Sequence, residues 1–222
     1  MKTMIKCAVA ALLAAAATGA AAQQRIDRPG TIAHAAADAQ FPERVGEFRR
    51  GNVHQYDEAG RDISATYNLV RPTGRIVLSI YIYPASRLGQ TDGAEQSRVA
   101  LCGREFDGVR GAIEAQNAGA LKLHQGTAPP VAGIEPGLSH RAVYRFTAPF
   151  DGERQEVRSE ADLYCFVGSD WLVKYRITAP AGLDIDADLD RFIRTGPWPG
   201  RPPAPQPDEM TQAEDGTEAR AG

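Results

Sequence analysis

Hydrophobic and polar residues alternate most regularly between positions 74 and 84. The apolar positions of one face are Ile76, Leu78, Ile80 and Ile82. A two-residue period is typical of a β-strand that turns one face to a core. Pro84 lacks a backbone donor and should end the strand. We therefore predict a central strand over residues 74–84 with an isoleucine-bearing face that needs a cover.

The next segment has the three- and four-residue spacing of an amphipathic helix. We predict this helix over residues 91–117, with a capping box of Asp92 and Glu95 at its start. Its apolar stripe consists of Val99, Cys102, Phe106, Val109 and Ile113. Because such a stripe packs on an apolar surface, we expect it to cover the isoleucine-bearing face of the central strand.

Alternating segments between turn residues predict the remaining strands. Two strands precede the central one; the first ends at the hairpin turn of residues 57–60, and the second covers residues 62–70. The strands expected after the helix span residues 121–124, 138–150, 153–167 and 171–178. A second amphipathic helix is expected over residues 185–194. The predicted fold class is α+β, an antiparallel sheet of about six or seven strands with two packed helices.

Composition divides the chain into four parts. Lys2 and Lys6 precede an apolar run that ends in small residues, which predicts a signal peptide over residues 1–22. Residues 23–40 lack a sustained period and are expected to form a flexible leader before a single domain over residues 41–198. Residues 199–222 are rich in proline and acids, which predicts a disordered tail.

These features predict a periplasmic or secreted protein with no stable membrane span in its mature chain. The formal charge of the 222-residue chain is -3, and loss of the two leader lysines changes it to -5. An acidic balance of this kind argues against nucleic acid as a partner.

The predicted mature chain keeps two cysteines, Cys102 and Cys165. Both are expected to point into the same layer, where they can form a disulfide in an oxidising compartment or stay as two buried free thiols. The absence of a C-x-x-C spacing argues against thiol redox catalysis.

Carboxylates alternate at Asp184, Asp186 and Asp188, as they do at the start of a calcium loop. Leu189 replaces the glycine of that loop and Thr195 replaces its bidentate glutamate. The alternative is that these acids favour the positive end of the helix, with Asp184 as the N-cap. No other pattern in the chain implies a metal or a cofactor.

Four arginines are candidates for binding an anionic ligand: Arg49, Arg50, Arg71 and Arg75. They lie on strands or turns that could be neighbours. The alternative is that they cover a sheet face and pair with acids such as Glu47, Glu58 and Asp62.

A catalytic site would have to be assembled from distant residues such as His54, Asp57 and His140. The four histidines lack the i, i+4 spacing of a zinc site on one helix. Ser139 and His140 are neighbours on a strand and point to opposite faces, so this serine cannot easily use that histidine as its base. No residue is therefore assigned a catalytic role.

The order of elements resembles that of the Mog1/PsbP-like α/β sandwich and of small exported bacterial domains. The resemblance covers residues 41–198 and consists of a Phe41-Pro42 entry, the paired strand at Thr66-Tyr67, the central strand, a long helix, and a meander that leads to a closing helix before Trp198. It implies a binding or accessory role and supplies no catalytic residues.

We therefore expect a non-catalytic binding or accessory module of the cell envelope that acts on an envelope protein or a small ligand. The alternatives are a hydrolase and a calcium-stabilised structural protein of the envelope.

Overall fold

The computed structural model describes residues 23–88 and 95–201. The expected signal peptide, the capping residue Asp92 and positions 202–222 of the expected tail lie outside these residues. The first tail residues are placed on the domain, because the N–H of Gly200 donates to the carbonyls of Ala37 and Asp38 at 3.0 and 3.1 Å. No helix in the described ranges is long and apolar enough to cross a membrane.

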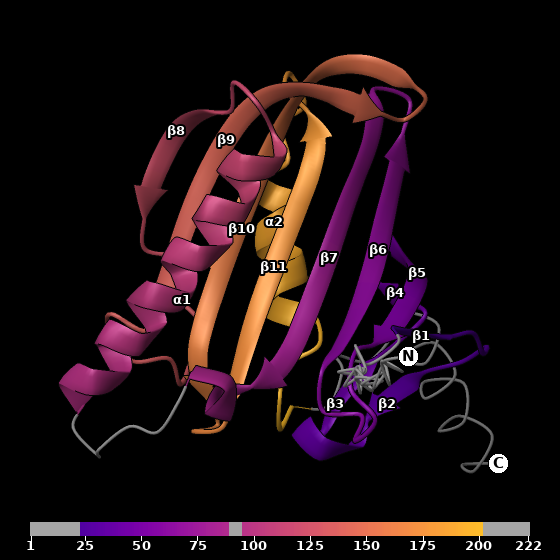
Figure 1. Ribbon diagram of the computed structural model, residues 1–222. Coiled ribbons are helices and arrows are strands. Elements are labelled where there is room, and N and C mark those ends of the chain that lie inside the picture. The colour runs from indigo at the N-terminus through magenta and orange to yellow at the C-terminus, as the bar shows by residue number, and fades with distance from the viewer. Residues whose placement is uncertain (1–22, 89–94, 202–222) are drawn as a thin grey trace, which may run out of the picture.

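One large antiparallel sheet dominates the structure (Figure 1). Its strands are β1 (Gln24–Ile26), β4 (Arg44–Val45), β5 (Phe48–Gln55), β6 (Ile63–Arg71), β7 (Gly74–Pro84), β8 (Leu121–Gly126), β9 (Ser139–Phe150), β10 (Glu153–Val167) and β11 (Trp171–Pro180). The order is β1-β5-β6-β7-β11-β10-β9-β8, with β4 beside β5. The α+β class is confirmed, and β1 and β4 bring the sheet to nine strands instead of six or seven.

The isoleucine-bearing face of β7 is covered by the second helix, α2 (Asp186–Thr195). Phe192 of α2 packs edge-on against Phe48 and Tyr67, with ring centroids 5.0 Å apart in both pairs. The adjacent strand β11 adds Tyr175 to the same cluster. This face therefore holds the larger of two apolar cores, and we call it the α2 face.

The long helix, α1 (Glu95–Gln116), packs on the opposite face, which we call the α1 face. Our prediction that it covers the isoleucine-bearing face is wrong. It lies over β9 and β10 (Figure 1), and its buried Phe106 and Ile113 share a core with Ala142 and Ala161. Small side chains on these two strands leave room for the helix, and α2 already occupies the other face.

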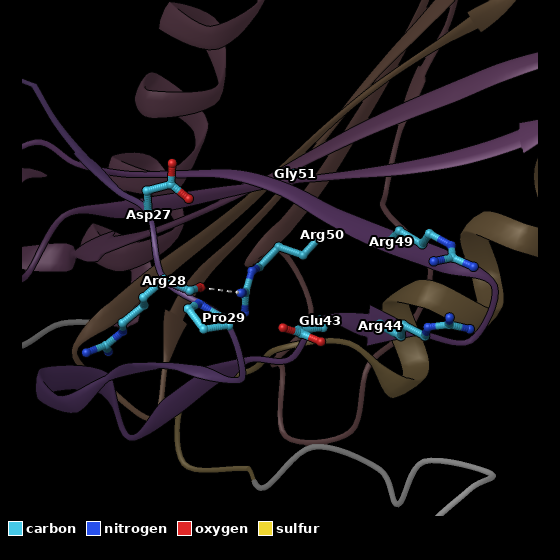
Figure 2. Close-up of a pocket in the computed structure, with 8 residues that line it drawn as sticks. All are labelled: Asp27, Arg28, Pro29, Glu43, Arg44, Arg49, Arg50 and Gly51. Carbon is cyan, nitrogen blue, oxygen red and sulfur yellow. Dashed lines mark hydrogen bonds between the residues drawn. The ribbon is translucent and has the colours of Figure 1, made fainter.

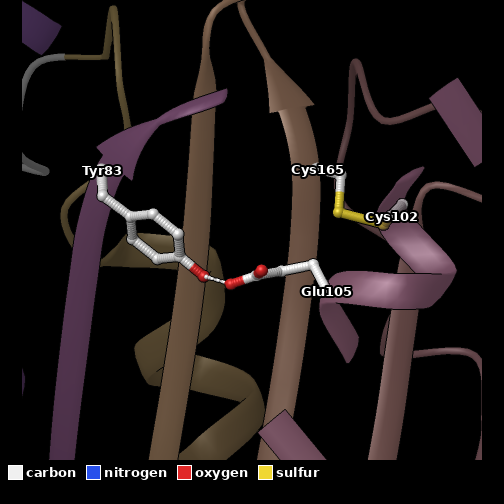
Figure 3. Close-up of a disulfide and its surroundings, with 4 residues drawn as sticks. All are labelled: Tyr83, Cys102, Glu105 and Cys165. Carbon is white, nitrogen blue, oxygen red and sulfur yellow. Dashed lines mark hydrogen bonds between the residues drawn. A yellow bond between two sulfur atoms is a disulfide. The ribbon is translucent and has the colours of Figure 1, made fainter. Parts of the chain in front are cut away.

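Three links fasten α1 to the sheet. Cys102 on α1 is joined to Cys165 on β10 by a disulfide (Figure 3). The hydroxyl of Tyr83 donates to Glu105 at 2.9 Å, and the hydroxyl of Tyr144 donates to Glu114 at 2.8 Å. The helix is thus tied to β7, β9 and β10, whereas its apolar contacts involve β9 and β10.

Residues 23–40 belong to the fold, which corrects the prediction of a flexible leader. After β1 they form β2 (Ile32–His34), the 3-10 helix η1 (Ala35–Ala37) and the beginning of β3 (Ala39–Phe41). A second 3-10 helix, η2 (Ala85–Leu88), follows β7. Ile32 and Ala37 are buried in the core of the α2 face. The elements are only three residues long, too short to show a period in the sequence.

Candidate functional site

Two of the four predicted arginines line an open pocket of about 550 Å³ beside the N-terminal segment (Figure 2). We call this the N-terminal pocket. The guanidinium of Arg50 donates to the carbonyls of Phe41, of Gly30 at 2.8 Å and of Arg28 at 3.3 Å. Glu43 accepts the N–H of Gly30 at 2.6 Å. Arg50 therefore fastens the N-terminal segment to β5, which leaves Arg49 as the exposed member of the predicted pair.

The other two arginines lie elsewhere. Arg71 pairs with Asp188 of α2 at 2.8 Å and with Glu47 at 3.4 Å. Arg75 pairs with Asp151 at 3.2 Å. The structure does not bring the four candidates to one anion site, and of the three partners expected for them only Glu47 forms a described ion pair with one of them.

The alternating aspartates at α2 are also separated. Asp184 accepts the N–H of Asp186 at 3.2 Å, Asp186 pairs with Arg158 at 2.7 Å, and Asp188 pairs with Arg71. The N-cap position is Ile185 rather than Asp184. Within the described ranges, no three His, Cys, Asp or Glu residues are grouped as metal ligands. The contacts match acids at a helix start that are held by arginines.

The residues considered for a hydrolase do not meet. Asp57 caps its turn by accepting the N–H groups of Arg61 and Asp62 at 2.8 and 3.2 Å. His140 stacks on Phe106 under α1, with ring centroids 5.1 Å apart. His54 lies on β5, five strand spacings from β9 in the sheet, which amounts to roughly 24 Å. The three side chains therefore cannot act on one substrate.

A different group of arginines lines the largest of the described pockets, a cavity of about 620 Å³. We call it the arginine pocket. Arg141 and Arg145 of β9 and Arg158 of β10 lie in it on the α2 face, beyond the N-terminal end of α2. Its outer wall is the segment 127–130, whose Pro129 carbonyl accepts the hydroxyl of Tyr164 at 3.0 Å. The pocket is thus built on rigid strands and a tethered loop.

Two of these arginines, Arg141 and Arg158, contact fully buried carboxylates on the core side of the pocket. Asp162 accepts Nε and Nη2 of Arg141, each at 2.7 Å, which is a bidentate pair. Glu160 lies 2.5 Å from Nη2 of Arg158 and 3.6 Å from Nε of Arg141. The Glu160 and Asp162 side chains are 0% exposed, whereas Arg141 and Arg158 keep 18% and 22% of theirs. The acids therefore fix the two guanidinium groups from the core side.

The electrostatics of this network favour charged arginines. Burial raises the pKa of Glu160 and of Asp162, and the guanidinium groups beside them act against this shift. Burial alone would lower the pKa of Arg141, but its bonds to Asp162 and the charge of Glu160 raise it. A buried carboxylate without such a partner would cost several kcal/mol. Arg141 thus remains a cation at physiological pH.

Arg145 is the most accessible cation of the pocket. It lies directly opposite Arg158 in the sheet register, where like charges repel. Arg145 forms an ion pair with Glu156 at 3.9 Å, and 45% of its side chain is exposed. Apolar surface is close by, from Leu123, Val143 and the two prolines of the wall. This arrangement can hold an anionic group against guanidinium donors and an apolar group against the wall.

The arginine pocket was not predicted from the sequence. A signal was present, because Glu160 and Asp162 alternate with Ala161 and Leu163 within a strand that is otherwise apolar at its centre. Acids at core positions need partners. The partner on β9 becomes evident only from the register, which sets Asp162 opposite Arg141.

We compared the chain with protein-family models, with curated proteins and with solved structures, and found no match.

Proposed function

We propose that this protein is a non-catalytic binding module of the cell envelope, and that its ligand is a small organic anion held in the arginine pocket. The observation that carries the proposal is the pair of buried carboxylates, which orient Arg141 and Arg158 beneath an open cavity. The predicted signal peptide and the Cys102–Cys165 bond support an exported location.

Charge and shape define the class of ligand. A carboxylate matches the planar fork of a guanidinium group, and Arg145 offers donors that no close carboxylate occupies among the described residues. The apolar wall favours a hydrocarbon or aromatic group on that carboxylate. Held in this way, the ligand needs no nucleophile or general base from the protein.

The experiment is a titration of the protein with phenylacetate, decanoate and acetate, followed by ¹H–¹⁵N NMR. We expect the two apolar carboxylates to shift amide signals of β9, β10 and segment 127–130, and acetate to bind at least tenfold more weakly. Binding should weaken as salt is added. Absence of saturable shifts at the pocket with every probe would overturn the proposal.

A matched pair of variants tests whether Arg145 binds the ligand. Arg145→Gln should weaken phenylacetate binding by about tenfold or more, because a hydrogen bond to a charged group contributes about 1.5–3 kcal/mol. Arg154→Gln changes an exposed arginine of β10 outside the pocket and should bind as the unaltered protein does. Equal affinity of Arg145→Gln and Arg154→Gln would contradict the assignment of Arg145. Arg145 is preferred to Arg141, because loss of Arg141 would leave buried acids unpaired.

A further inference from the structure

Two cations lie side by side on the α1 face of β11, next to the Tyr83–Glu105 bond that links α1 to β7. Lys174 is opposite Tyr81 of β7, and Arg176 is opposite Ser79. Because α1 packs over β9 and β10 (Figure 1), the strands β11, β7 and β6 extend beyond it on this face. Lys174 and Arg176 are two residues apart on one strand, so their attachment points are about 7 Å apart. We call them the cation pair.

Neither member of the cation pair has a carboxylate partner in the described part of the chain. The ammonium of Lys174 lies over the rings of Tyr81 and Tyr83, 4.3 and 5.7 Å from their centroids. Among the described residues, Arg176 donates only to a main-chain carbonyl, that of Glu160, at 3.4 Å. Neither positive charge is therefore neutralised by an ion pair with the described residues.

The acids nearest to Lys174 are already engaged. Glu105 accepts the hydroxyl of Tyr83, and Asp62 pairs with Arg87. Both acids act on Lys174 only at longer range. Each therefore stays with its own partner, outside ion-pair distance of the ammonium.

Both cations are half-buried, and this makes the missing counter-charge costly. Burial lowers the pKa of Lys174; the charges of Glu105 and Asp62 act against this shift, and the positive charge of Arg176 adds to it. Burial also lowers the pKa of Arg176. A partly desolvated cation without an anion is unfavourable, and two of them side by side repel. A bound anion would remove both costs at once.

We propose that the cation pair binds the phosphate group of a phosphate monoester. Two adjacent cations are best neutralised by a dianion, and a phosphate monoester carries about -1.5 to -2 at pH 7, whereas a carboxylate carries -1. The guanidinium of Arg176 supplies a planar fork and Lys174 a point charge, the two donor types that hold phosphate groups. The hydroxyls of Ser79 and Thr66, 3.3 Å apart, lie along the same face.

This site is independent of the proposed function. The arginine pocket lies on the α2 face and the cation pair on the α1 face, with the sheet between them. A ligand can therefore occupy one site without contact with the other.

The test compares phenyl phosphate with phenylacetate, which share an aromatic ring and differ in the anionic group. In a ¹H–¹⁵N NMR titration of the protein, phenyl phosphate should shift amide signals of β7 and β11 and bind there at least tenfold more tightly than phenylacetate. Equal affinity of the two probes at β7 and β11, or no saturable shift there, would overturn the proposal. Shifts confined to β9 and β10 would place the probe in the arginine pocket and would also overturn it.

Variants then identify the residues. Lys174→Gln and Arg176→Gln should each weaken phenyl phosphate binding tenfold or more, and Arg154→Gln serves as the matched control. Arg176→Lys keeps the charge but loses the fork, so binding should weaken by a smaller factor; this variant decides the question if Arg176→Gln fails to fold. Unchanged affinity in Lys174→Gln and Arg176→Lys would exclude the cation pair as the site.

Discussion

The two helices stabilise opposite faces of the sheet by different means. On the α2 face, a ten-residue helix places Leu189, Phe192 and Ile193 in a continuous apolar core. On the α1 face, a helix of twenty-two residues is tied to three strands by a disulfide and two tyrosine–glutamate bonds. Both faces thus have an apolar core, but on the α1 face the helix is also held by discrete links and leaves β11, β7 and β6 beyond its edge. Uncovered sheet on a rigid scaffold is where a ligand can reach polar side chains.

The strongest test of this contrast removes the covalent link. We expect Cys102→Ala/Cys165→Ala to lower the free energy of unfolding by about 4 kcal/mol, because the bond closes a loop with a sequence separation of 63 residues. Urea unfolding measures the change. Amide exchange should become faster in α1 than in α2. Equal exchange in both helices, or a loss below about 1 kcal/mol, would contradict the view that α1 depends on its links.

A second test compares two positions on opposite faces of β7. Ile80 is buried on the α2 face, and Val77 is half-buried on the α1 face beyond the helix. Ile80→Ala should cost about 3 kcal/mol of unfolding free energy, whereas Val77→Ala should cost about 1 kcal/mol or less. Chemical denaturation of both variants gives the comparison. Similar losses would show that the α1 face of β7 is as tightly packed as the α2 face.

The smallest expected effect concerns pH. His34 is buried on the α2 side beside Trp171, and burial lowers its pKa, which the main chain of Arg61 and Gly60 only partly opposes. Above about pH 6.5 the residue is neutral in both states; as the pH falls below this value, the unfolded chain gains a proton that the folded protein binds less readily. Stability should therefore decrease on acidification, by at most about 1.4 kcal/mol per pH unit from this one group.

The control is His34→Phe, which keeps an aromatic ring at the position. Thermal unfolding should show that the melting temperature falls less between pH 7.5 and pH 5.5 for His34→Phe than for the unaltered protein. Equal losses would mean that His34 titrates alike in both states.

Local pattern predicted the elements better than their arrangement. The strand over residues 74–84 and the meander that contains β10 follow from alternation and turn residues, which act over a few neighbouring positions. The helical stripes were also present in the sequence. A stripe shows that a helix has one apolar side, but it does not show which sheet face receives it. Both Ala161 on β10 and Ile80 on β7 offer apolar surfaces, on opposite faces of the sheet.

The candidate sites could not be predicted from the sequence for a related reason. Arg141 and Asp162 are distant in sequence, and only the β9–β10 register makes them partners. Candidates chosen because they are adjacent in sequence, such as Arg49 and Arg50, do not form one site. Arg49 is exposed, whereas Arg50 donates to main-chain carbonyls. Cross-strand geometry therefore decides the sites, and it cannot be read from spacing along the chain.

The Cys102–Cys165 disulfide also determines in which compartment the protein reaches its full stability. A reducing cytosol keeps cysteines as free thiols, so a newly made chain would lack the covalent bond between α1 and β10. If the chain is exported as we propose, it stays easier to unfold for translocation and gains its last few kcal/mol of stability after arrival.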